Sequence, residues 1–129
     1  MIINPELEKA AGYAAAWSSN NPENVAEHFL EEATVQINGR VPLVGREAIA
    51  QEYAAPFFDN FPGCTVLMHD FRLAGSHALF TGMLVCNLGS GQLVRLLGWE
   101  EWTLHDNGEI ANSLVWFDQK EYDRQVRRA

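Results

Sequence analysis

Apolar positions recur with helical spacing at the start of the chain. Asn4 stands where an N-cap is favoured and Pro5 occupies the first helical position, so a helix is predicted over residues 4–19. One face of this helix is apolar. It carries Leu7, Ala10, Ala14 and Trp17, with Tyr13 beside them.

A second Asn-Pro pair, Asn21 and Pro22, predicts a shorter helix over residues 20–32. We expect its inner side to carry Val25, Phe29 and His28, and its letters "EHFLEE" to form a solvated acidic face. The following "ATVQIN" alternates as a strand, and "NG" at positions 38 and 39 predicts a turn.

A third helix is predicted over residues 45–61, where Ile49, Tyr53 and Phe57 share one face. Pro56 weakens the expectation for its last turn, because proline lacks an N–H donor. Asp118 then predicts the cap of a final helix, with Glu121 at the capping-box position.

The second half of the chain changes to long alternating segments separated by short polar turns. Strands are predicted over residues 64–74, 77–87, 92–105 and 109–117, with turns at "AGSH", "GSGQ" and "HDNGE". Helices followed by consecutive antiparallel strands predict an α+β fold in which helices cover one face of a curved sheet. Such a sheet leaves a cavity beneath the helices, and its other face is free to meet a second subunit.

Composition narrows the possible functions. The 129 residues make one domain, residues 1–129, and 47% of them are hydrophobic, which suffices for a packed core. The net charge of -8 argues against a nucleic acid or an anionic membrane as partner, because both require a cationic face. No stretch approaches the roughly 20 apolar residues of a membrane span, and the first residues do not resemble an export signal.

Two cysteines, Cys64 and Cys86, have no metal-ligand spacing. They would meet if they lay on neighbouring strands, but we expect free buried thiols in a cytoplasmic protein. The four histidines are scattered, and the chain contains no glycine-rich phosphate loop and no motif of known hydrolases. We therefore expect neither a metal nor a cofactor.

Two adjacent acids interrupt the apolar segment "LLGWEEWTL" at residues 96–104. Neighbouring residues of a strand point to opposite faces, so Glu100 and Glu101 occupy different environments. We expect Glu100 inside, beside Trp102, and Glu101 on the outer face or in a subunit contact. Burial raises the pKa of a carboxyl group, so Glu100 is either a neutral donor to a developing oxyanion or a structural acid paired with Arg95, Arg72 or a backbone amide.

Two other side chains are candidates for chemistry in the same cavity. His69 shares the more apolar face of its strand with Leu67 and Phe71, where an imidazole is either a general base or a core histidine with one hydrogen bond. Tyr13 lies one helical turn before Trp17, and its phenol is either a second donor into the cavity or a structural hydroxyl.

Several segments resemble a known family. The letters "YAAAWSSNNPENVAEHFLEEATVQING", "VGREAI", "GWEEW", "NGEIANS" and "FDQKEYDRQ" are similar to the polyketide-cyclase-like (SnoaL-like) branch of the nuclear transport factor 2-like superfamily, from about residue 7 to residue 125. The resemblance implies a cone-shaped, cystatin-like α+β barrel with a curved antiparallel sheet wrapped around helices. It also implies a deep pocket and a homodimer formed through the sheet. It leaves the activity open, because one fold hosts many activities.

The ketosteroid isomerases of this superfamily allow a comparison residue by residue. Their site has an aspartate base and an oxyanion hole made by a tyrosine and a protonated aspartic acid. The resemblance places Tyr13 on that tyrosine, Glu100 on the protonated acid and Tyr53 on its supporting tyrosine. Ile37, followed by Asn38, replaces the base, so proton transfer would need His69 or a water held by Asn38.

We expect the pocket to be lined by Trp17, Ile37, Tyr53, Phe57, Trp102, Ser113, Val115 and Phe117. Two hypotheses follow. The first is an enzyme that moves a proton through an enolate of a small apolar carbonyl compound, as an isomerase, cyclase or dehydratase. The second is a non-catalytic homodimer that binds an apolar ligand or a protein partner in the same pocket. Epoxide hydrolysis by Glu100 with Asp70 and Arg72 is disfavoured, because strand alternation puts these residues on different faces.

Overall fold

A computed structural model describes residues 5–87 and 91–128. The predicted Asn4 cap and part of the "GSGQ" turn lie outside the described residues. The elements in chain order are α1 (Pro5–Ser18), α2 (Pro22–Ala26), β1 (Phe29–Ile37), β2 (Leu43–Val44), α3 (Arg46–Ala48), the π-helix η1 (Ile49–Ala54), α4 (Ala55–Asn60), β3 (Thr65–Ala74), β4 (His77–Asn87), β5 (Leu93–Leu104), β6 (Ile110–Phe117) and α5 (Gln119–Arg128).

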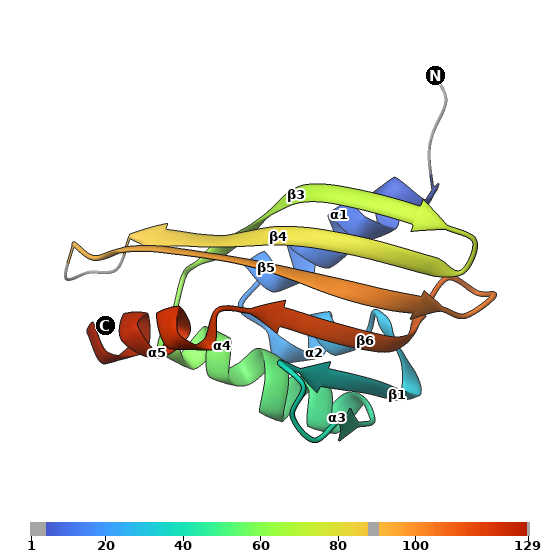
Figure 1. Ribbon diagram of the computed structural model, residues 1–129, viewed down its shortest axis with the longest axis horizontal. Helices are drawn as coiled ribbons and strands as arrows, with labels where there is room; N and C mark the ends of the chain where they lie inside the picture. The colour runs from blue at the N-terminus through green and yellow to red at the C-terminus, as the bar shows by residue number, and fades with distance from the viewer. Residues whose placement is uncertain (1–4, 88–90, 129) are drawn as a thin grey trace.

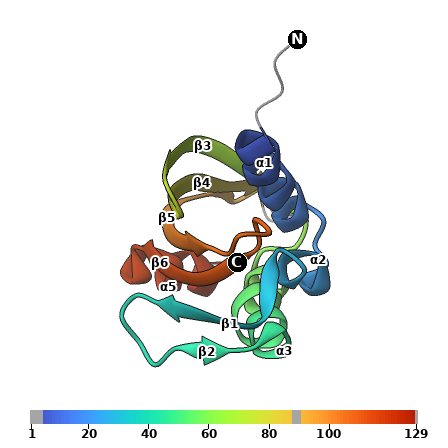
Figure 2. The same cartoon turned by 90° about the vertical axis from the view of Figure 1, so that its right-hand side faces the viewer.

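One six-stranded sheet, in the order β2-β1-β6-β5-β4-β3, forms the frame of the molecule (Figure 1). Its neighbouring strands are antiparallel except β1 and β6, which run parallel. The sheet is strongly curved but not closed, as the end-on view in Figure 2 shows. The predicted α+β class with a curved sheet is therefore confirmed, with one parallel pair and an open edge.

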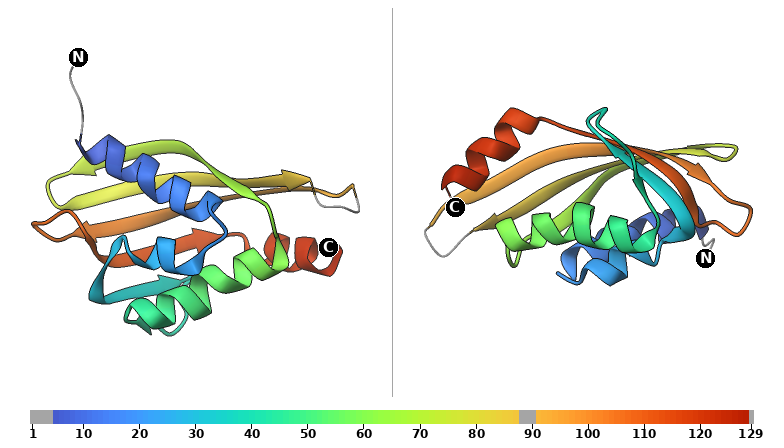
Figure 3. Two further views of the ribbon diagram at one scale, coloured as in Figure 1. Left: turned by 180° about the vertical axis from the view of Figure 1, so that it is seen from behind. Right: turned by 90° about the horizontal axis from the view of Figure 1, so that it is seen from below.

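Helices α1 to α4 cover the concave face of the sheet, whereas α5 lies at one end of it (Figure 3). The main core lies between the two layers and contains residues from both, including Tyr13 and Trp17 of α1 and Phe80 and Trp102 of the sheet. Burial of this apolar surface holds the helices on the sheet.

The four long strands agree with the predicted segments to within one residue at each end. Asp118 caps α5 as predicted, since its Oδ1 accepts hydrogen bonds from the backbone N–H groups of Lys120 and Glu121. The "NG" turn is also confirmed: Asn38 has a φ of 50° and Gly39 one of 73°.

The second helix is shorter than predicted. Asn21 caps it as expected, but α2 ends at Ala26, and the chain enters β1 at Phe29. Phe29 is fully buried and pairs with Ile110 of β6, so it belongs to the sheet and not to a helical face. Strand pairing and burial have overridden the helical pattern, so the predicted helix over "EHFLEE" was wrong, although the acids of this segment are exposed as predicted.

The third helix continues through Pro56 to Asn60. Its turns over Ile49–Ala54 are π-helical, and the N–H of Ala55 donates to the carbonyl of Ala50. A wider turn of this kind precedes the proline without breaking the helix, and such turns are frequent at functional sites. Tyr53 lies within it.

Cys64 and Cys86 form a disulfide, so the expectation of free thiols was wrong. Cys64 precedes β3 and Cys86 lies near the end of β4, the neighbouring strand, which brings the two residues to a Cα–Cα distance of 4.5 Å. The cysteines therefore lend no support to the predicted cytoplasmic location, because disulfides persist mainly in oxidising compartments. Within the described residues, no helix is long and apolar enough to cross a membrane.

Candidate functional site

Glu100 lies on the concave face of β5, in the centre of the sheet. It pairs with Phe80 of β4 on one side and with Val115 of β6 on the other, and the residue is only 5% exposed. Glu101 points to the opposite face, is exposed, and accepts a hydrogen bond of 2.9 Å from Nε1 of Trp116. The predicted division of the two acids is confirmed.

Four side chains donate hydrogen bonds to the Glu100 carboxyl group. The hydroxyl of Tyr13 contacts Oε1 at 3.0 Å and Oε2 at 2.9 Å, and the hydroxyl of Tyr53 contacts Oε2 at 2.9 Å. Nε1 of Trp102 and Oγ of Ser113 contact Oε1 at 2.9 and 2.8 Å. A carboxylate has roughly four acceptor positions, which is the number of these donors. The donors come from α1, η1, β5 and β6, so they meet at Glu100 only in the folded protein.

No cation balances this acid in the part of the chain that the structure describes. The three ion pairs found there join other residues, and neither Arg95 nor Arg72 bonds to Glu100. Burial raises the pKa of Glu100, while the hydrogen bonds from Trp102 and Ser113, and from the two tyrosines, oppose that rise by stabilising the charged form.

The two tyrosines remain neutral donors. Burial, reinforced by the nearby Glu100 charge, raises the pKa of Tyr13 and of Tyr53 well above its ordinary value. Neither phenol loses its proton near neutral pH, so both keep an O–H directed at the carboxyl group.

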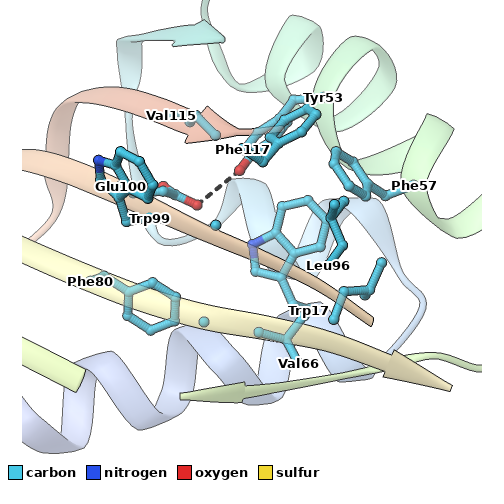
Figure 4. A pocket seen from close by; sticks show the side chains of 13 residues that line it. Trp17, Tyr53, Phe57, Val66, Phe80, Leu96, Trp99, Glu100, Val115 and Phe117 are labelled. Carbon is cyan, nitrogen blue, oxygen red and sulfur yellow. Dashed lines mark hydrogen bonds between the residues drawn. The ribbon is translucent and has the colours of Figure 1, made fainter. Parts of the chain in front are cut away.

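A cavity of about 70 Å³ lies between the sheet and the helices, next to Glu100 (Figure 4). It is lined by Trp17, Tyr53, Phe57, Val66, Phe80, Gly82, Leu84, Leu96, Gly98, Trp99, Glu100, Val115 and Phe117. Glu100 and Tyr53 are joined by their hydrogen bond at one part of this lining, and most of the other lining residues are aromatic or aliphatic.

Five of the eight predicted lining residues line the cavity: Trp17, Tyr53, Phe57, Val115 and Phe117. Trp102 and Ser113 lie behind it and contact Glu100, while Ile37 packs against the edge of the core. Phe80, Gly82 and Leu84 were missed, although their alternation along one strand places them on the same face.

His69 does not reach the cavity. A bulge in β3, between Met68 and Asp70, shifts the alternation by one residue, so Val66 and Met68 turn inward and His69 is exposed. The prediction put His69 on the face of Phe71, but the extra residue places Phe71 on the same face as Met68 and leaves His69 outside. Asp70 and Arg72 form an ion pair with each other, at a distance of 3.3 Å, and not with Glu100.

Asn38 also lies elsewhere, and its amide group is occupied. Its Oδ1 accepts a hydrogen bond from the N–H of Phe117, and its Nδ2 donates to Oε1 of Gln119. These bonds hold the left-handed turn after β1 against the end of β6. Asn38 is therefore not placed to hold a water against a ligand.

Comparison with known proteins gives the family. A model of the SnoaL-like domain matches residues 10–113, which is most of the chain. The chain belongs to the SnoaL-like domain family. No curated protein matches the sequence.

Solved structures resemble this SnoaL-like chain over nearly their whole length at low identity. A hypothetical protein of ketosteroid isomerase-like fold from Catenulispora acidiphila, in complex with trimethylamine, has a TM-score of 0.79 at 17% identity, covering 97% of this chain and 95% of its own. A putative SnoaL-like polyketide cyclase from Jannaschia has a TM-score of 0.78 at 17% identity, covering 100% and 99%. TerC, co-crystallised with polyporic acid, has a TM-score of 0.77 at 15% identity, covering 96% and 99%. At this identity the likeness shows the fold alone.

Proposed function

We propose that the cavity binds a small apolar carbonyl compound, and that Glu100 and Tyr53 donate hydrogen bonds to its oxygen. The observation that carries the proposal is a buried carboxyl group on the wall of an aromatic cavity, without a paired cation among the described residues. Burial favours the protonated form, which has an O–H to donate. Protonation also releases one surrounding hydroxyl from the carboxyl group, and Tyr53 is the one that lines the cavity.

Donors of this kind stabilise the negative charge that develops on a carbonyl oxygen when a base from the solvent, such as hydroxide, takes a proton from the neighbouring carbon and carries it away as water. Each preorganised donor contributes about 10²–10³ in rate. The same enolate step serves isomerisation, aldol-type cyclisation and dehydration. The membership of the SnoaL-like family and the similarity to a putative polyketide cyclase agree with this reaction class.

The two tyrosines differ in role. Tyr53 lines the cavity and bonds to one carboxyl oxygen, so it faces the ligand. Tyr13 is fully buried behind the lining and bonds to both oxygens, so it positions the carboxyl group. This reverses the assignment that the resemblance to ketosteroid isomerases implied.

Non-catalytic binding is the second candidate. Among the described residues that line the cavity, Glu100 is the only one with a carboxyl group, and none is a histidine or a lysine. Because His69 and Asn38 lie elsewhere, the lining offers no separate base for the proton. The hypothetical protein of ketosteroid isomerase-like fold is in complex with a small molecule, trimethylamine.

Exchange of the methyl protons of acetophenone in deuterated water tests for enolate formation, because exchange requires the enolate. We expect the protein to accelerate exchange, and Glu100→Gln to slow it at least about tenfold. Glu101→Gln is the matched control, since it changes the neighbouring acid on the outer face.

Binding of acetophenone across pH 4 to 9 separates the two candidates. Binding that is tighter at acidic pH in the wild type, and does not depend on pH in Glu100→Gln, supports the donor role of Glu100. If binding follows this pattern but exchange is not accelerated, the protein is a binder. Affinity that is independent of pH in the wild type would contradict the donor role altogether.

We also propose a homodimer through the outer face of the sheet. Leu67 and Leu97 are 57% and 49% exposed on this face, and both pair with Met83 of β4. An exposed apolar patch of this kind marks an interaction surface. Light scattering after gel filtration should give a dimer for the wild type and for Val41→Lys, an exposed control in the β1–β2 connection, but a monomer for Leu97→Lys. A monomeric wild type would refute the dimer.

A further inference from the structure

Two glycines in the middle of the sheet are not explained by their own backbone dihedral angles. Six of the described glycines have positive φ, which explains them as turn residues. Gly82 and Gly98 do not: they lie within β4 and β5 and pair directly with each other. Glycine inside a strand weakens it and often marks a place where a ligand approaches the backbone.

Both glycines line the cavity, and the part of the sheet that they form, which we call the floor of the cavity, carries no side chains of its own. On the concave face, the pair separates the Leu84–Leu96 pair from the Phe80–Glu100 pair. Every other pair of this inner set carries side chains, so the glycine pair is the one place in the set where the strands present only backbone to the cavity. Trp17 and Phe57 reach the same cavity from the helices.

Gly82 is the more informative of the two. A Cβ atom on Gly98 would lie 3.1 Å from the carbonyl oxygen of Trp116, so close backbone packing accounts for that glycine in part. A Cβ atom on Gly82 would instead lie 3.1 Å from side-chain atoms of Phe80 and of Val66, which line the cavity themselves. A side chain at Gly82 would therefore crowd two side chains of the cavity lining.

Bare strand backbone suits a particular shape of ligand. Two paired residues without side chains expose peptide groups that lie nearly in the plane of the sheet. A planar ring contacts this surface over its whole face, whereas a puckered ring touches it only through its axial hydrogens. Since dispersion falls steeply with a gap of 0.5–1 Å, the planar ring gains more. A cavity of about 70 Å³ has room for no more than one ring.

The floor also fixes the direction of the ligand. Glu100 lies two residues beyond Gly98 on the same face of β5, a rise of about 6.8 Å. A single ring on the glycine pair therefore directs an attached oxygen toward the Glu100 carboxyl group and the hydroxyl of Tyr53.

We propose that Gly82, with the facing Gly98, determines the specificity of this cavity by forming a side-chain-free floor for one planar ring that carries an oxygen, as in an aryl ketone. This inference rests on the proposed function of the cavity. It adds the shape of the ligand and the residue that selects it.

Two ketones with the same number of carbons test the floor. Acetophenone has a planar ring, and cyclohexyl methyl ketone has a puckered one with the same carbonyl substituent. We expect the wild type to bind acetophenone at least about tenfold more tightly, as judged by quenching of tryptophan fluorescence or by NMR titration. Equal affinity for the two ketones, or no binding of acetophenone, would overturn the proposal without requiring any variant.

Gly82→Ala should weaken acetophenone binding by at least about tenfold, because its Cβ occupies the floor. Gly12→Ala is the matched control in α1, where a Cβ meets only an ordinary contact of 3.5 Å, and it should stay within about twofold of the wild type. If Gly82→Ala does not fold, Val66→Ala/Gly82→Ala removes one of the two side-chain atoms that the new Cβ would meet at 3.1 Å, with Val66→Ala as reference. Unchanged affinity in a folded Gly82 variant would overturn the proposal.

The same titrations distinguish a failure of the floor from a failure of the Glu100 site. Binding that responds to Glu100→Gln and to pH but not to Gly82→Ala refutes the floor alone. Binding that prefers the planar ketone and responds to Gly82→Ala but not to Glu100→Gln keeps the floor and refutes the donor role of Glu100.

Discussion

Ser113→Ala is the most direct test of how the protein tolerates a buried acid. The Ser113 side chain is fully buried on β6, opposite Trp102, and its Oγ donates to Oε1 of Glu100 at 2.8 Å. The substitution deletes one oxygen and no carbon, so it leaves only a small hole. Its effect therefore reports the hydrogen bond more than packing.

The size of the effect depends on the protonation of Glu100. A hydrogen bond to a charged group contributes about 1.5–3 kcal/mol, and one between neutral groups contributes about 0.5–1.5 kcal/mol. We expect Ser113→Ala to lower the free energy of unfolding by the larger amount where Glu100 is ionised and by the smaller amount where it is protonated. Because Ser113 stabilises the charged form, its loss should also raise the pKa of Glu100 further.

Urea unfolding, followed by circular dichroism at several pH values from 4 to 9, measures this difference. The same substitution in a Glu100→Gln background completes a double-mutant cycle, in which the cost of losing Ser113 should be the smaller one at every pH. A cost that does not change with pH, and is the same in both backgrounds, would refute the view that these donors hold a carboxylate.

Three further outcomes are expected. Because burial raises the pKa of Glu100, its contribution to stability is complete below the unfolded pKa of about 4.3 and is lost as pH rises through the folded pKa. Urea midpoints should show this loss in the wild type and in Glu101→Gln but not in Glu100→Gln, and three identical pH profiles would contradict it. Tyr53→Phe and Tyr13→Phe should each lower the free energy of unfolding by about 1–3 kcal/mol, and titration with acetophenone should show weaker binding for Tyr53→Phe alone. Reducing the disulfide should lower the free energy of unfolding by about 3 kcal/mol, since it closes a loop with a sequence separation of 22; urea curves with and without reductant would coincide if the disulfide did not contribute.

Local patterns were sufficient for most of the fold. Period-two alternation and turn residues located β3 to β6 closely, and caps such as Asn21 and Asp118 located helix starts, because these features depend on neighbours in the chain. The same alternation separated Glu100 from Glu101 correctly. Errors arose where distant pairing competes with a local pattern, as at Phe29, which joins the sheet.

The site itself required the tertiary structure. His69 changed face because one extra residue in β3 inverts the alternation, and no local pattern marks that bulge. Tyr13 and Tyr53 come from different helices, so only packing against the sheet decides which phenol faces the cavity and which stands behind Glu100. The sequence placed an acid inside the protein, but hydrogen-bond geometry and desolvation depend on distances between residues up to 87 positions apart. Such distances exist only once the chain has folded.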